Sequence, residues 1–222
     1  MIQIRNLFFR YPRSQFVLAI DSLDVAAGEK VAFVGPSGSG KTTLLNLICG
    51  ISVPAQGTIR VADAEVSSLS DHDRRNFRIS KIGLVFQQFE LLPYLNVVDN
   101  ILLPYRINRS LQLTAQVRSR AQNLVDRLGI GDKCLRLPRQ LSQGEQQRTA
   151  LCRALIAEPK LILADEPTGN LDDENKTRAL QLLCEKSQEQ NAALVVVTHD
   201  TGILGDFDRV VDFRQFRRRE VA

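Results

Sequence analysis

The stretch Gly35-Pro36-Ser37-Gly38-Ser39-Gly40-Lys41-Thr42 decides how this chain folds. It follows the apolar residues 31–34, which predict a buried strand. Residues 43–49, which begin with Thr43, come directly after it and predict the start of an amphipathic helix. Glycines at this spacing let successive backbone N–H groups point inward at an oxyanion, and the helix N-terminus adds further donors. The G-x-x-x-x-G-K-T spacing therefore predicts a phosphate-binding loop, in which Lys41 reaches the β- and γ-phosphates and Thr42 ligates Mg²⁺.

The overall composition is that of a globular protein with one sizeable core and room for a smaller lobe. The chain has 222 residues, of which 44% are apolar and 24% charged. Its net charge of +4 suits nucleotides or an anionic lipid surface and is too weak to predict nucleic-acid binding. The cysteines at 49, 134, 152 and 184 form no C-x-x-C pair, which favours scattered core thiols in a reducing compartment.

Three features bear on membranes. The first residues lack a signal-peptide pattern, and no apolar run approaches the roughly 18 residues of a spanning helix. We therefore expect a cytoplasmic protein that contacts a membrane only through a partner or a surface. Residues 214–219 read Arg-Gln-Phe-Arg-Arg-Arg; they predict a solvated tail, with contact to anionic lipid as the alternative.

The pattern of apolar residues predicts an α/β fold with a helical insertion. Alternating patterns in residues 2–26, and again in residues 57–61, indicate antiparallel strands at one edge. Continuous apolar runs at residues 82–86, 161–164 and 193–197 are typical of parallel strands covered on both faces. Between them, helical spacing from Val117 to Leu128, with Gly129 as cap, and a second helix over residues 142–157 indicate a helical lobe.

Two acids follow the apolar strand at residues 161–164. Asp165 ends that strand, and an acid there, beside a phosphate-binding loop, can hold Mg²⁺. Glu166 comes next, where it can orient or deprotonate an attacking water. The pair therefore predicts hydrolysis of a bound nucleotide rather than binding alone.

A second helix N-terminus carries the sequence Leu141-Ser142-Gln143-Gly144-Glu145. Ser142 and Glu145 have the spacing of a capping box, so helix capping alone explains them locally. The same helix end also presents a second anion site, about a hundred residues from the first. Capping does not explain why this site accompanies the other motifs.

Over nearly its whole length the chain resembles the ATP-binding-cassette (ABC) ATPases. The family's motifs occur in order: the P-loop at 35–42, a glutamine loop at Gln87, the signature at 141–145, the Walker B strand at 161–166, an aspartate loop at 168–172 and a switch histidine, His199. The resemblance implies a P-loop NTPase fold, in which a mostly parallel core sheet with an antiparallel edge carries an inserted helical subdomain. We expect a core lobe of residues 1–87 and 158–222 and a helical lobe of residues 88–157.

The resemblance also implies roles for individual residues. Glu166, His199 and Gln87 would be catalytic, and Thr42, Gln87 and Asp165 would hold Mg²⁺. Tyr11 would stack on adenine, although packing at the surface explains it equally simply. In this family two subunits pack head to tail, so Ser142 and Gly144 of one would contact the γ-phosphate bound by the other, and Asp172 would couple the sites. The expected ATP-binding residues are Tyr11, Gly35, Pro36, Ser37, Gly38, Ser39, Gly40, Lys41, Thr42, Thr43, Ser142, Gly144 and Asp172.

The signature departs from the family's commonest form, L-S-G-G-Q. Gln143 replaces a glycine and Glu145 replaces the glutamine, while the serine and the second glycine are kept. We expect a working site with an altered rate of hydrolysis.

The aspartate loop contains Gly169-Asn170, which is similar to bacterial cassettes of the macrolide-export, lipoprotein-release and cell-division group. This implies an ATPase, most simply a homodimer, at the cytoplasmic face of the inner membrane. A permease-type membrane subunit would dock near Phe89–Leu95; the alternative is that Phe89, Leu91 and Leu92 simply pack the helical lobe. Two alternatives remain: a regulatory cassette that drives a membrane scaffold without transport, and a soluble cassette with no membrane partner.

Overall fold

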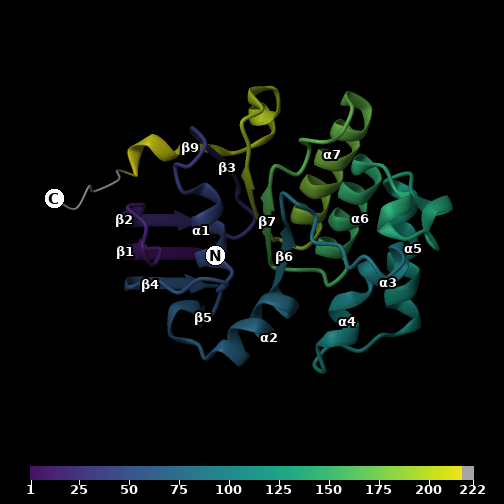
Figure 1. Ribbon diagram of the computed structural model, residues 1–222, viewed down its shortest axis with the longest axis horizontal. Coiled ribbons are helices and arrows are strands. Elements are labelled where there is room, and N and C mark those ends of the chain that lie inside the picture. The colour runs from purple at the N-terminus through teal and green to yellow at the C-terminus, as the bar shows by residue number, and fades with distance from the viewer. Residues whose placement is uncertain (217–222) are drawn as a thin grey trace.

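The computed structural model describes residues 1–216, which form two separate sheets with helices between and beside them (Figure 1). The Arg-rich residues 217–219 of the predicted tail lie outside the described range. The first sheet is antiparallel, with strand order β2-β1-β4-β5. Its strands are β1 (Ile2–Arg10), β2 (Val17–Val25), β4 (Gln56–Val61) and β5 (Ala64–Glu65).

Alternating burial explains why the first sheet forms. Ile2 and Ile4 are fully buried and pair with Val25 and Leu23 of β2, while the residues between them face solvent. This period of two gives the sheet one apolar face and one wet face. The predicted antiparallel edge is confirmed.

The second sheet is entirely parallel, with strand order β6-β7-β8-β3-β9. Its strands are β3 (Lys30–Val34), β6 (Ile82–Val85), β7 (Leu161–Asp165), β8 (Ala193–Val197) and β9 (Arg209–Asp212). Both faces are covered, because Leu161 and Leu163 join one hydrophobic cluster while Ile162 and Ala164 join the other. The three continuous apolar runs are therefore parallel strands, as predicted. The sequence did not reveal β9, a four-residue edge strand whose first two residues are exposed.

Helix α1 joins the two sheets into one body. Its buried leucines and isoleucine share a hydrophobic cluster with residues of β1, β3, β4 and β7, and Figure 1 shows it between the antiparallel strands and the parallel ones. The helices are α1 (Lys41–Ile48), α2 (Asp71–Lys81), α3 (Val97–Ile101), α4 (Leu103–Ile107), α5 (Ala115–Arg127), α6 (Gln143–Leu155) and α7 (Asp173–Glu189).

Helices α3, α4, α5 and α6 group on the side of the parallel sheet that faces away from the antiparallel sheet (Figure 1). The predicted helix before Gly129 is α5, and Gly129 ends it with a positive φ of 64°. The second predicted helix is α6, which stops at Leu155, two residues before the expected end. The sequence patterns did not reveal α7 or α2, which is charged and has no fully buried residue.

No helix among residues 1–216 is long and apolar enough to cross a membrane. The second hydrophobic cluster contains residues of α3, α5 and α6 together with residues of β7, β8 and α7. The helical segment thus shares its core with the parallel sheet. That residues 88–157 form a separate helical lobe stays a prediction.

Candidate functional site

A cleft of about 460 Å³ lies at the carboxyl edge of the parallel sheet. Parallel strands present their carboxyl ends at one edge, so the residues after β3, β7 and β8 meet there. The predicted site residues that line the cleft are Tyr11, Gly35, Ser37, Gly38, Gly40, Lys41, Thr42, Thr43, Gln87, Asp165, Glu166 and His199. Five other predicted site residues do not line it: Pro36, Ser39, Ser142, Gly144 and Asp172.

The loop between β3 and α1 curls around the mouth of this cleft. Gly40 caps α1 with φ of 103°, and a Cβ atom built there would lie 2.9 Å from Cζ of Phe16, so only glycine fits. The Lys41 ammonium donates to the backbone carbonyls of Gly35 at 2.8 Å and Pro36 at 2.9 Å. These acceptors are neutral, so phosphate oxygens can replace them with stronger, charge-assisted bonds.

Thr42 and Asp165 bring two oxygen ligands together from α1 and β7. The Thr42 hydroxyl donates to Oδ2 of Asp165 at 2.6 Å. Asp165 is only 5% exposed, and this burial raises the pKa of its carboxyl, while the Thr42 bond and Lys41 act in the opposite direction. Since a buried carboxylate is costly, a cation at this position would stabilise its charged form.

Glu166 and His199 face each other across the ends of β7 and β8. Nδ1 of His199 lies 2.7 Å from Oε1 of Glu166. The Glu166 side chain is 16% exposed and that of His199 is 79% exposed. A carboxylate held in this way can accept a proton from water, and the catalytic role of Glu166 stays a prediction.

The signature residues lie on a different surface. Ser142 caps α6, its hydroxyl accepting from the Glu145 N–H at 3.2 Å, while the Glu145 carboxylate accepts from the Ser142 N–H at 2.7 Å. This confirms the predicted capping box. Gly144 faces the aspartate loop, because a Cβ atom there would lie 3.3 Å from the carbonyl oxygen of Asn170. Within this chain, therefore, the helix end predicted to be a second anion site does not line the first cleft.

Comparison with known proteins gives this arrangement a family. A family model described as "ABC transporter" matches residues 18–169, about two thirds of the chain. The chain belongs to the ABC transporter family.

Individual relatives agree with this assignment. The lipoprotein-releasing system ATP-binding protein LolD of Hydrogenovibrio crunogenus is 44% identical over 84% of this chain and 80% of that protein. The macrolide export ATP-binding/permease protein MacB of Rhodopirellula baltica is also 44% identical, over 86% of this chain and only 28% of that longer protein. A solved dimeric structure of the ATP-binding cassette MJ0796, in a post-hydrolysis state with ADP and Pi, superposes with a TM-score of 0.88. It is 33% identical, and the match covers 96% of this chain and 94% of that one.

The chain is thus an ABC ATPase with a P-loop NTPase fold, and it resembles the LolD and MacB group as expected. The cleft is lined by two aromatic residues rather than the one that the sequence predicted. Tyr11 is 37% exposed and its hydroxyl lies 3.3 Å from Oγ1 of Thr43. Phe16, which the sequence analysis missed, also lines the cleft, with its ring 6.0 Å from that of Tyr11.

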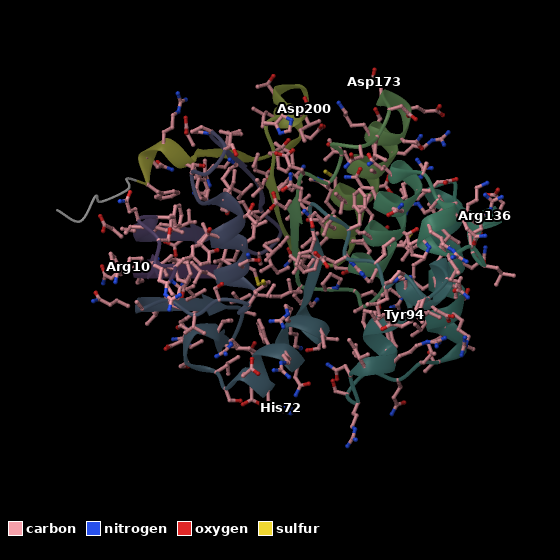
Figure 2. The ribbon with its side chains drawn as sticks, viewed as in Figure 1. Arg10, His72, Tyr94, Arg136, Asp173 and Asp200 are labelled. Atoms are coloured by element: carbon pink, nitrogen blue, oxygen red, sulfur yellow. The ribbon has the colours of Figure 1, made fainter. Side chains whose placement is uncertain are left out.

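The aspartate loop of this ABC ATPase leads into α7. Asp172 caps that helix by accepting from the Asn175 N–H at 2.9 Å, and these bonds from Asn175 lower the pKa of its carboxyl. One helical turn after Asp172, Lys176 of α7 pairs with Asp200 at 2.8 Å. Asp200 directly follows His199. Figure 2 shows Asp173 and Asp200 along one edge of the molecule.

One further buried side chain escaped the sequence analysis. Gln147 on α6 is 1% exposed and bridges the backbone of Glu166 to that of Asn170. Its position, one helical turn after Gly144, was visible in the sequence. Nothing in the sequence indicated which backbone groups the Gln147 side chain would bond.

Proposed function

We propose that this chain is the ATP-hydrolysing subunit of a membrane complex of the lipoprotein-release or macrolide-export kind, working as a dimer at the cytoplasmic face of the inner membrane. The identity to LolD and to the ATPase part of MacB supports this assignment. In this proposal ATP closes the dimer, and the membrane partner passes the motion on to its external domain.

The observation that carries the proposal is the separation of the two anion sites. Ser142 and Gly144 present an exposed helix N-terminus, yet neither lines the cleft formed by Lys41 and Thr42. Head-to-tail pairing of two copies would bring each signature helix to the γ-phosphate held by the other copy. The dimeric state of the MJ0796 cassette supports this pairing.

The residues around Thr42 fit a magnesium ion. Mg²⁺ prefers oxygen ligands, and the Thr42 hydroxyl and the buried Asp165 carboxylate already lie 2.6 Å apart. Gln87 also lines the cleft and would contribute its amide oxygen. When bound, Mg²⁺ supplies charge neutralisation at the phosphate oxygens.

The protein's own residues then account for hydrolysis. Backbone N–H groups of the loop and Lys41 hold the phosphates, and Glu166 accepts a proton from the attacking water. The water oxygen forms a bond to the γ-phosphorus, the bond from that phosphorus to the β–γ bridging oxygen breaks, and ADP and phosphate leave. His199 orients Glu166 through the 2.7 Å contact and contacts the γ-phosphate.

A groove of about 210 Å³ offers a place for the membrane subunit. Residues of α2, β6, α4 and α6 line it, among them Leu103 and Ile107, and it receives Glu90 from the predicted docking stretch. Phe89, Leu91 and Leu92 of the same stretch are half-buried, and they are not among the partly buried residues that pack on the two hydrophobic clusters of the described residues. Arg153 of α6 donates to the carbonyls of Phe89 and Glu90, both at 2.5 Å, and so fixes the wall of the groove.

The central test is Glu166→Gln. Loss of the proton acceptor should lower the rate of phosphate release by about 10²–10⁴-fold. Binding of Mg-ATP should persist, and a dimer should accumulate on size-exclusion chromatography. Fast hydrolysis by this variant, or a purely monomeric ATP-bound form, would contradict the proposed mechanism.

The groove is tested by Ile107→Asp, a charge placed on a residue that is 59% exposed. We expect the isolated subunit to hydrolyse ATP normally and to lose co-purification with its membrane subunit, because a buried carboxylate is costly. Leu135→Asp is the matched control, since Leu135 is 85% exposed and lies outside the groove. Equal losses of co-purification in both variants would remove the groove from the docking site.

A further inference from the structure

Gln147 connects the signature helix to the residue that carries hydrolysis. It lies on α6, and its side chain is buried between that helix and the chain that follows β7. Burying an amide in this way is costly unless its polar atoms are bonded. The hydrogen bonds of its amide therefore indicate the role of Gln147.

Both polar atoms of the Gln147 amide bond to backbone groups of the same short segment. Nε2 donates to the carbonyl oxygen of Glu166 at 2.9 Å, and Oε1 accepts from the N–H of Asn170 at 3.1 Å. A carbonyl can only accept and a backbone N–H can only donate, so the partners fix the orientation of the amide. The side chain thus spans the turn from Glu166 to the aspartate loop.

The backbone of Glu166 needs such support. Its φ of 50° is in the left-handed region, which costs a non-glycine residue on the order of 1–3 kcal/mol. Its N–H donates to the carbonyl of Val197 at 2.9 Å, and its carbonyl accepts from Gly169 at 3.2 Å as well as from Gln147. Of these three partners, only Gln147 is a side chain, and only Gln147 comes from the helix that Ser142 caps.

We propose that Gln147 is a positioning residue for ATP hydrolysis. It holds the Glu166 backbone so that the carboxylate points into the cleft toward His199, and it ties that placement to α6. The inference rests on the proposed role of Glu166. A mutation of Gln147 should therefore change the rate of hydrolysis at saturating ATP and leave the affinity for ATP unchanged, because Gln147 is not among the residues that line the cleft.

The first experiment compares Gln147→Met with Thr149→Val in the full chain. Met fills a similar volume without either hydrogen bond, and we expect kcat to fall by about 10–100-fold, with KM for ATP within about two-fold. Thr149 is the matched control, since it is fully buried on the same helix and its hydroxyl donates only to the carbonyl of Glu145 at 2.8 Å. We expect a lower Tm and a normal kcat from the control. If kcat fell in proportion to the loss of Tm in both variants, the proposal would be overturned.

The second experiment uses Gln147→Glu, which also serves if Gln147→Met does not fold. The introduced carboxyl can still accept from the Asn170 N–H, but when ionised it repels the Glu166 carbonyl. Burial raises the pKa of such a carboxyl, and below that pKa it is protonated and donates as the amide does. The kcat of the variant relative to the natural chain should therefore rise as pH falls from about 8.5 to about 6. A ratio that does not change with pH would overturn the proposal.

A double substitution separates this inference from the proposed function. If Gln147 acts through Glu166, adding Gln147→Met to Glu166→Gln should leave the residual single-turnover rate unchanged within about two-fold. A further 10-fold loss would show an independent role and overturn the proposal. Fast hydrolysis by Glu166→Gln alone would instead contradict the role of Glu166, a result that the Gln147 variants cannot produce.

Discussion

The N-termini of α1 and α6 are both predicted anion sites, yet they are built in opposite ways. At α1 the cap is Gly40 in a left-handed conformation, and no side chain among the described residues caps the helix. At α6 Ser142 and Glu145 form a reciprocal capping box. The first helix end opens into a cleft lined by its own chain, whereas the second opens onto the surface beside the aspartate loop.

In the proposed function, the α1 end binds ATP and the α6 end takes part in its hydrolysis. A helix end without a side-chain cap leaves its N–H donors for a ligand, which suits the phosphate-binding role proposed for α1. A helix end that caps itself is stable without a ligand, which suits a surface that meets phosphate only when a second copy arrives. The two ends should therefore respond differently to mutation.

The largest expected effect comes from comparing a mutation at the α1 end with a mutation at the α6 end. Lys41→Ala should weaken ATP binding by the monomer, because the phosphates lose a charged donor. Ser142→Arg should leave monomer binding intact and abolish both dimer formation and hydrolysis, because a long side chain then blocks the signature surface. Fluorescent ATP-analogue titration and phosphate release measure the two properties.

The control for Ser142→Arg is Ser70→Arg, because Ser70 caps α2 in the same manner. This substitution removes an equivalent cap, worth roughly 1 kcal/mol, away from the proposed interface. Ser70→Arg should lower Tm and leave ATP binding, dimer formation and hydrolysis unchanged. If Ser142→Arg abolished ATP binding by the monomer, the comparison between the two helix ends would fail.

A smaller effect should follow from Asp165→Asn at the α1 end. Burial raises the pKa of Asp165, so its contribution to stability is full under acid conditions and is lost as pH rises through the raised pKa. Asparagine removes that loss, and the ATP-free variant should match or exceed the natural chain in Tm at neutral pH, by about 2–4 °C for each kcal/mol. The gain in Tm on adding Mg-ATP should shrink. Thermal melts at about pH 5 and pH 7.5 measure both; an ATP-free variant that is less stable only at neutral pH would contradict this account.

The smallest effect is expected at the α6 end from Glu145→Gln. Glutamine keeps the capping box but loses the charge that complements the helix dipole, worth about 0.3–1 kcal/mol. It also removes a negative charge from the surface that would meet the γ-phosphate. We expect a slightly lower Tm and half-maximal hydrolysis at lower ATP concentration.

The matched control is Glu174→Gln in the first turn of α7. It should lower Tm by a similar small amount without changing the dependence on ATP. If both variants changed that dependence equally, the charge of Glu145 would have no specific place at the signature surface.

Much of the site was predictable from the sequence, because its chemistry is local. The phosphate-binding loop, the acids after β7 and the capping box each depend on residues within a few positions of one another. The runs of β-branched and aliphatic residues placed most strands correctly for the same reason. Helix α2 and strand β9 were missed because a charged helix and a four-residue edge strand leave weak patterns.

The sequence by itself determined the phosphate-loop pattern and the helix caps, and so the prediction of which groups handle phosphate, since turn geometry and capping depend on near neighbours. Only the tertiary structure decided which of those groups share a cleft. The order of strands in the parallel sheet brings Thr42 to Asp165 and Glu166 to His199, across 123 and 33 residues of chain. The same packing places Gln147 under Glu166. Such contacts depend on how whole elements cover one another's apolar faces, and no short stretch of residues encodes that.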